Sequence, residues 1–191
     1  MKIFTLIFIG ISLYLTSFSQ KLTPDEKILL NKLDSEYSSD NNKVSLNYAW
    51  LLYRANNEAN YSKADIILNK TISMQDHDSE SLTYGQWGWT WKDGEKVVDW
   101  NIALFQAHIM FCGLWSEQGK MSPETRSNFI SSCNQLVEAA KRRWDYEVFD
   151  IYRDFASYSN VFAMYIQTFT LAADRFNNPR LRKLAKGQWT R

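Results

Sequence analysis

Cysteine and proline are scarce in this chain, and residues typical of β-strands rarely occur in runs. The 191 residues include two cysteines and three prolines. No CxxC pair and no Cys/His spacing of the zinc-binding kind is present, so the sequence indicates no metal site, and no motif points to a cofactor. The lack of strand patterns favours an all-α fold.

The two cysteines, Cys112 and Cys133, fall in consecutive predicted helices on either side of a turn. At 1.5 Å per residue their axial positions differ by roughly 7 Å, which is more than a disulfide readily spans. We therefore expect two buried thiols rather than a disulfide.

An excess of charge of either sign is also missing. The chain has 22 basic and 21 acidic residues, and loss of Lys2 with a leader would balance them. Polyphosphate binding needs clustered cations, whereas the densest basic run, 141–143, lies at a predicted helix end, where cations complement the helix dipole. Nucleic acid is therefore not expected as a partner.

Only one long apolar run occurs, over residues 3–15. It is short for a membrane span, which needs about 20 residues. It follows Met1-Lys2 and precedes small residues, which is the pattern of a secretory signal. We predict a signal peptide over 1–19, a periplasmic or secreted location, and no membrane association after cleavage.

A repeated pattern organises the remaining chain. Asn47, Asn101 and Asn160 each open an apolar run, and these positions are about 54 and 59 residues apart. A near-constant period of this size predicts one repeated supersecondary unit. Each unit has the pattern of a helical hairpin.

Each proline follows a residue able to cap a helix, in Thr23-Pro24, Ser122-Pro123 and Asn178-Pro179. Proline is favourable at the first helical position, because its missing N–H would have no partner there. With the apolar periodicity, these signals predict helices over 24–37, 46–57, 62–74, 99–117, 123–143, 158–175 and 179–186.

Two kinds of helix alternate along the chain. The runs from Ile102 and Val161 are apolar almost all round, as expected of inner helices, whereas the helix from Pro123 has one apolar stripe. We predict a single α-helical domain over 20–191, with an N-terminal helix and three inner/outer pairs. Stacked antiparallel hairpins of this kind are typical of an α/α toroid, here partial, or of a helical solenoid.

Two long connections, 75–98 and 144–157, should lie on the same face of such an array, and long connections are often functional. The first contains Tyr84, Trp87, Trp89 and Trp91. These side chains could form an aromatic platform for sugar rings, or alternate tryptophans could instead fill the core. The second contributes Tyr152 and Arg153 as further candidates for substrate binding.

The segment 154–161, the apolar helix after it and the closing segment 178–185 together resemble one hairpin of the secreted α/α-toroid carbohydrate-active proteins. That group includes glycosidases and heparinase-like polysaccharide lyases. The resemblance covers roughly the last forty residues, and more weakly the unit that begins at Asp99. It implies an oligosaccharide groove at the N-termini of the inner helices, where helix dipoles attract anions.

The resemblance places the candidate catalytic residues at these N-termini. A hydrolase needs two carboxylates across the scissile bond, for which Asp99 and Asp154 are the best pair. A lyase would instead use a tyrosine as acid or base with an amide nearby, which selects Tyr158 and Asn160. Trp100 and Asn101 complete the substrate-binding candidates.

Simpler roles stay open for these residues. Asp99 and Asn101 could be helix caps, and Tyr158 could be a packing residue. Three pairs also make only about half a toroid, which predicts a fragment, an open domain or an oligomer. We therefore expect an exported protein that cleaves or recognises an oligosaccharide or polysaccharide, and the alternative is a non-catalytic carbohydrate-binding or protein-interaction domain.

Overall fold

The protein is described by a computed structural model over residues 21–97, 101–145 and 159–186. These residues fold into helices and form no strand, only two isolated bridges. The predicted all-α class is confirmed. The helices are α2 (Pro24–Glu36), α3 (Ser45–Arg54), α4 (Glu58–Ser73), α5 (Ile102–His108), α6 (Pro123–Asp145), α7 (Ser159–Arg175) and α8 (Pro179–Ala185).

The three helix starts predicted at prolines are confirmed by their caps. The Thr23 hydroxyl accepts a hydrogen bond from the Glu26 N–H at 3.2 Å, and the Glu26 carboxylate accepts one from the Thr23 N–H at 2.8 Å. This reciprocal capping box satisfies two backbone donors. The Ser122 hydroxyl accepts from the Thr125 N–H at 3.2 Å, and the Asn178 side chain accepts from the first turn of α8.

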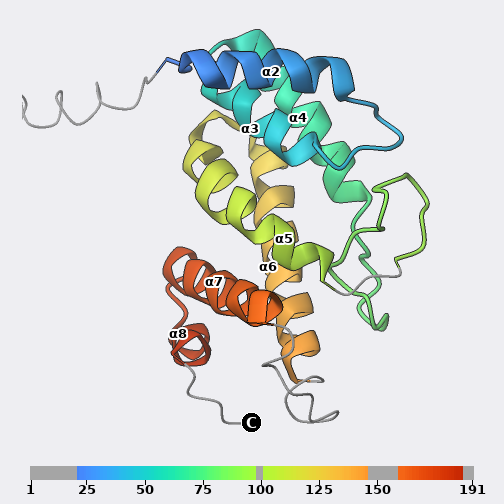
Figure 1. Ribbon diagram of the computed structural model, residues 1–191, viewed down its shortest axis with the longest axis vertical. Coiled ribbons are helices and arrows are strands. Elements are labelled where there is room, and N and C mark those ends of the chain that lie inside the picture. The colour runs from blue at the N-terminus through green and yellow to red at the C-terminus, as the bar shows by residue number, and fades with distance from the viewer. Residues whose placement is uncertain (1–20, 98–100, 146–158, 187–191) are drawn as a thin grey trace, which may run out of the picture.

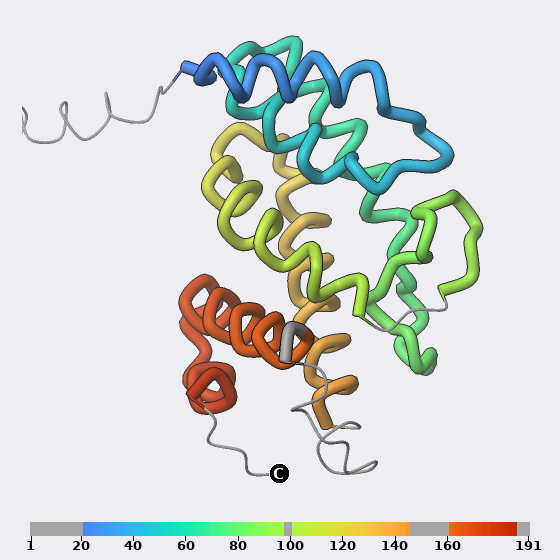
Figure 2. Tube along the Cα trace, viewed as in Figure 1, coloured from blue at the N-terminus to red at the C-terminus, as the bar shows by residue number. Residues whose placement is uncertain are grey.

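The helices stack along the long axis of the molecule (Figure 1). Helix α2 packs on α3, α3 packs on α4, and α6 contacts α4, α5 and α7, while α7 also contacts α5 and α8. Consecutive helices therefore contact each other as α3 with α4, α5 with α6 and α7 with α8. The axes of α7 and α8 are not parallel, because α8 is seen end-on in Figure 2 while α7 lies across the view. The last pair therefore differs from the predicted antiparallel hairpin.

The helix predicted over 99–117 changes its winding along its length. After α5 the chain continues as a π-helical segment, Ile109–Gly113, and then as a 3₁₀ segment, Leu114–Lys120. A Cβ added to Gly113 would lie 2.7 Å from the Ile109 side chain. The Arg175 guanidinium donates to the Phe111 carbonyl at 2.9 Å, so the change of winding does not leave that carbonyl unpaired.

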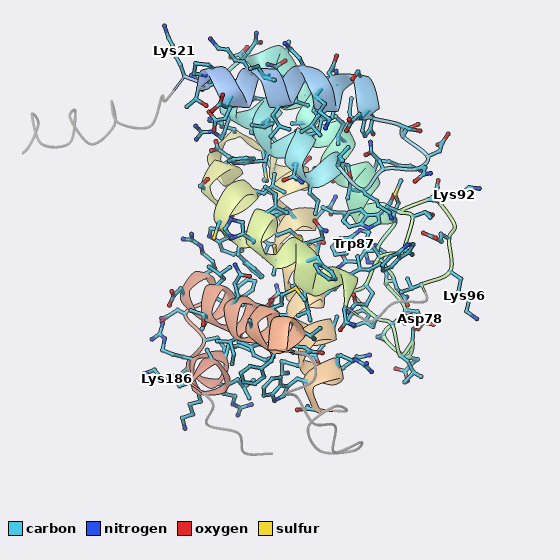
Figure 3. All side chains as sticks on the ribbon, in the orientation of Figure 1. Lys21, Asp78, Trp87, Lys92, Lys96 and Lys186 are labelled. Carbon is cyan, nitrogen blue, oxygen red and sulfur yellow. The ribbon has the colours of Figure 1, made fainter. Side chains whose placement is uncertain are left out.

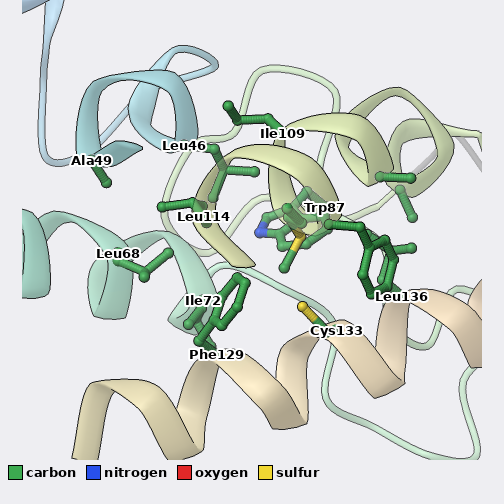
Figure 4. Close-up of a cluster of buried hydrophobic side chains, with 14 of the residues drawn as sticks. Leu46, Ala49, Leu68, Ile72, Trp87, Ile109, Leu114, Phe129, Cys133 and Leu136 are labelled. Carbon is green, nitrogen blue, oxygen red and sulfur yellow. The ribbon is translucent and has the colours of Figure 1, made fainter. Parts of the chain in front are cut away.

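The hydrophobic core extends through all the helix pairs. The predicted apolar stripe of α6 is confirmed, because Phe129, Cys133, Leu136, Ala140 and Trp144 are buried. Figure 4 shows part of this core, in which the indole of Trp87 lies among side chains from the helices. A residue of the long loop is thus a component of the core.

Both cysteines are free thiols, so the prediction of no disulfide is confirmed. Cys133 is buried, and burial raises the pKa of its thiol well above the ordinary value. Cys112 is only half-buried, which differs from the expected full burial. Among the described residues, no helix combines the length and the apolar character that a membrane crossing requires. The predicted signal peptide lies outside the described residues.

Candidate functional site

Half of the predicted site residues lie outside the part of the chain that the structure describes. These are the three catalytic candidates and three of the substrate-binding candidates: Asp99, Trp100, Tyr152, Arg153, Asp154 and Tyr158. Asn160 belongs to α7, and its side chain is also outside the description. The long loop 75–97 and Asn101 can be placed.

The base of the loop is anchored to α6 through a buried amide. The Gln75 side chain donates to the Gly85 carbonyl at 2.8 Å and accepts from the Ser132 hydroxyl at 2.7 Å. An isolated bridge also pairs Gln75 with Trp87. Because buried polar groups are costly to leave unpaired, these bonds fix the position of the loop on the helices.

The tryptophans of the loop alternate between the core and solvent. Trp87 is 0% exposed and Trp91 is 2% exposed, and their rings stack with centroids 5.2 Å apart. The Trp87 indole N–H donates to the Thr71 carbonyl at 2.8 Å. The assignment of these two indoles as substrate-binding is therefore corrected: they fill the core, because neither ring has a face open to a ligand.

Trp89 is the exposed member of the series, with 52% of its surface accessible. The Lys43 ammonium lies 5.1 Å from the centre of its ring. In Figure 3 Lys92 and Lys96 lie on the outer edge of the same loop, whereas Trp87 is directed toward the helices. Trp89 thus belongs to the solvent-exposed tip of the loop.

One carboxylate organises that tip. Glu95 accepts hydrogen bonds from the Thr90 N–H at 2.9 Å and from the Thr90 hydroxyl at 2.7 Å. Gly88 makes room for this group, because an added Cβ would lie 2.1 Å from a Glu95 carboxylate oxygen. Burial alone would raise the pKa of the Glu95 carboxyl, but the hydrogen bonds from Thr90 and the neighbouring backbone outweigh burial and lower it.

This lowered pKa predicts a contribution to stability that depends on pH. The unfolded chain binds the proton more tightly, so the contribution is present above the ordinary glutamate pKa of 4.5 and is lost as pH falls through the folded-state value. We expect wild type to lose more free energy of unfolding than Glu95→Gln between pH 6 and pH 3. Urea unfolding of both proteins across this range measures the effect, and equal losses would contradict it.

The N-terminus of α5 is capped by a residue from the loop. The Gln86 side-chain oxygen accepts from the Ala103 N–H at 2.7 Å, and Gln86 is buried. Asn101 occupies the N-cap position, but its side chain makes no capping hydrogen bond. The resemblance implies that the backbone N–H groups at the N-terminus of α5 face a ligand. One of them, the Ala103 N–H, instead donates to Gln86. The sequence did not indicate this role of Gln86, because no local pattern links it to Ala103, which lies seventeen residues further along the chain.

A groove of about 490 Å³ lies between α6, α8 and the loop. Its apolar surface comes from Val137, Phe176, Leu181 and Leu184. Its polar side chains include Tyr84, Asn134, Gln135, Glu138, Lys141 and Arg180. Of these, sequence reasoning selected only Tyr84, because the exposed side of an outer helix gives no signal beyond ordinary polarity.

Tyr84 is held in place at the wall of this groove. The Arg142 guanidinium lies 4.7 Å from the centre of the Tyr84 ring, and Arg142 donates to the carbonyls of Ser79 at 2.9 Å and Ser81 at 3.3 Å. The same cation thus contacts the ring and ties the loop to α6. Two turns earlier on the same face of α6, His77 lies 2.7 Å from the Gln135 amide oxygen.

Comparisons with family models, with curated proteins and with solved structures found no match for this chain. Within 21–97, 101–145 and 159–186, no three histidine, cysteine, aspartate or glutamate side chains come together as a group able to hold a metal ion. The groove next to Tyr84 brings an aromatic ring, amides and charged groups to one concave surface, and these features make it the candidate site.

Proposed function

We propose that this chain is an exported carbohydrate-recognition protein that binds an oligosaccharide in the groove beside Tyr84. The observation that carries the proposal is the fixed tyrosine ring at the wall of a groove lined by three amides, a carboxylate and two cations. The volume of about 490 Å³ is within the range of small-molecule sites, roughly 300–1,000 Å³.

The chemistry of the groove suits a sugar. The C–H face of a pyranose packs on an aromatic ring, and its hydroxyls both donate and accept hydrogen bonds. Asn134 and Gln135 offer both roles, and the Glu138 carboxylate accepts. Tyr84 requires little reordering on binding because Arg142 already covers one face of its ring.

The location differs from the one that the resemblance implies. The groove lies on the solvent side of α6, an outer helix, rather than at the N-termini of the inner helices.

We further propose that the helix pairs form a partial α/α-toroid-like array. Contacts of α3 with Ile109–Lys120, of α5 with α7 and of α4 with α6 support two layers. Cleavage by Asp99, Asp154 and Tyr158 remains a prediction on residues outside the described part.

Replacement of Tyr84 by alanine tests the proposal. We expect at least tenfold weaker binding, since a stacked aromatic ring contributes both area and geometry to a ligand. A panel of neutral and uronate tetrasaccharides, titrated by calorimetry, measures the affinity.

The matched control is Trp89→Ala, which removes an exposed aromatic from the same loop but not from the groove. It should leave the affinity within twofold of wild type. Loss of binding in Trp89→Ala with normal binding in Tyr84→Ala would move the site to the loop tip. Absence of binding to every sugar of the panel would reject the carbohydrate function.

A further inference from the structure

The groove beside Tyr84 has an uncompensated positive charge. Its ionisable side chains are Glu138, Lys141 and Arg180. Lys141 and Glu138 pair with each other at 3.0 Å within α6, so their charges offset. Arg180 makes no ion pair or side-chain hydrogen bond with another residue of the described part. The net charge of the lining is therefore that of Arg180.

The surroundings of Arg180 reinforce this charge. The segment 179–186 contains Arg180, Arg182, Lys183 and Lys186 and no acidic residue, although the whole chain is nearly neutral, with 22 basic and 21 acidic residues. Arg182 pairs with Asp174 at 3.3 Å. Figure 3 shows Lys186 at the same end of the molecule as α8. The positive field of α8 thus favours an anionic ligand over a neutral one.

A guanidinium is well suited to binding an anionic ligand. Its planar fork donates two parallel hydrogen bonds to a carboxylate or to a sulfate, a geometry that an ammonium cannot match. Arg180 lies on the α8 wall, and Tyr84 is contributed by the loop. A sugar stacked on Tyr84 would place its ring substituents between these elements.

We infer that Arg180 is a specificity-determining residue that selects oligosaccharides carrying an anionic group, a uronate carboxylate or a sulfate ester. This inference rests on the proposed carbohydrate function and adds the class of ligand. The ring is held by Tyr84, and the charge is recognised by Arg180.

The test compares matched ligands on matched variants. The ligands are a galacturonate tetrasaccharide, its carboxyl-reduced neutral counterpart, and the neutral form bearing sulfate esters. The variants are Arg180→Gln and Arg182→Gln, which remove the same charge from α8, but only Arg180 lines the groove. Calorimetric titration of wild type and both variants at one fixed salt concentration gives the affinities.

We expect wild type to bind at least one anionic tetrasaccharide about tenfold more tightly than the neutral one. Arg180→Gln should remove that preference by weakening the binding of the anionic tetrasaccharide far more than that of the neutral one, whereas Arg182→Gln should keep the preference. Which anionic ligand loses affinity identifies the carboxylate or the sulfate as the source.

Three results would overturn the inference. If wild type binds the neutral and anionic tetrasaccharides equally, Arg180 does not recognise the anionic group. If Arg180→Gln and Arg182→Gln reduce the preference alike, the field of α8 acts without a specific contact. If no tetrasaccharide binds at all, the proposed function fails together with the inference, whereas neutral binding without preference leaves the proposed function intact.

Discussion

Replacement of Trp87 by alanine is expected to lower the free energy of unfolding by about 4 kcal/mol. Trp87 is 0% exposed, stacks on Trp91 and donates its indole N–H to the Thr71 carbonyl. The variant would lose the buried ring and leave a cavity, and the Thr71 carbonyl would lose the indole N–H while keeping its bond from the Met74 N–H at 3.2 Å. Since small domains are stable by roughly 5–15 kcal/mol, this is a large share.

Trp89→Ala provides the matched control, because it removes the same side chain two positions away. Trp89 is exposed and its one described ring contact is with Lys43, so a loss of about 0.5 kcal/mol is expected. Urea unfolding followed by circular dichroism measures both variants. Equal losses would contradict the division of the loop into a buried and an exposed side.

Gly85→Ala is expected to cost about 3 kcal/mol, from two sources that add. Gly85 has φ +80°, a region that costs a residue with a Cβ about 1–2 kcal/mol. The added Cβ would also lie 2.2 Å from the Gln135 carbonyl oxygen. That oxygen belongs to the backbone of α6, so it cannot move aside as a flexible side chain could.

Gly94→Ala separates these two sources. Gly94 has φ +70°, but a Cβ there would meet no atom within 4 Å. It should therefore show the backbone cost alone, about 1 kcal/mol. The difference between the two variants in urea unfolding measures the close approach of the loop to α6. A loss in Gly85→Ala no greater than in Gly94→Ala would show that the loop can withdraw from α6.

The Gly85→Ala substitution also bears on the site, because Tyr84 precedes Gly85 directly. Three contacts with α6 hold the loop at the groove: Gln75 with Ser132, Gly85 with the Gln135 backbone, and Arg142 with the carbonyls of Ser79 and Ser81. Gly85→Ala should therefore weaken oligosaccharide binding as well, even though glycine itself contributes no ligand contact.

The part of the site that sequence could identify was limited to what a local pattern reveals. Aromatic enrichment selected Tyr84 together with the three tryptophans, and alternation allowed either a ligand platform or core packing. Burial then separated Trp87 and Trp91 from Trp89. The groove residues Asn134, Gln135 and Arg180 carried no signal, because polar side chains on a helix surface are the ordinary expectation.

The sequence by itself determined the approximate positions of the helices and the three caps at the prolines, but not the winding of 102–120 or the cap of α5. Periodic apolar positions, and the pairs Thr23-Pro24, Ser122-Pro123 and Asn178-Pro179, act within a few residues of their own backbone, so their effect can be read without knowledge of distant neighbours. The burial stripe of α6 followed from the same periodicity.

Only the tertiary structure decided where the loop 75–97 lies and what it does. Its position depends on contacts with residues far along the chain, such as Gln86 with Ala103 and Arg142 with Ser79. No local rule specifies such pairs, because many polar side chains could satisfy the same backbone groups. The groove exists only because this loop, α6 and α8 meet in space.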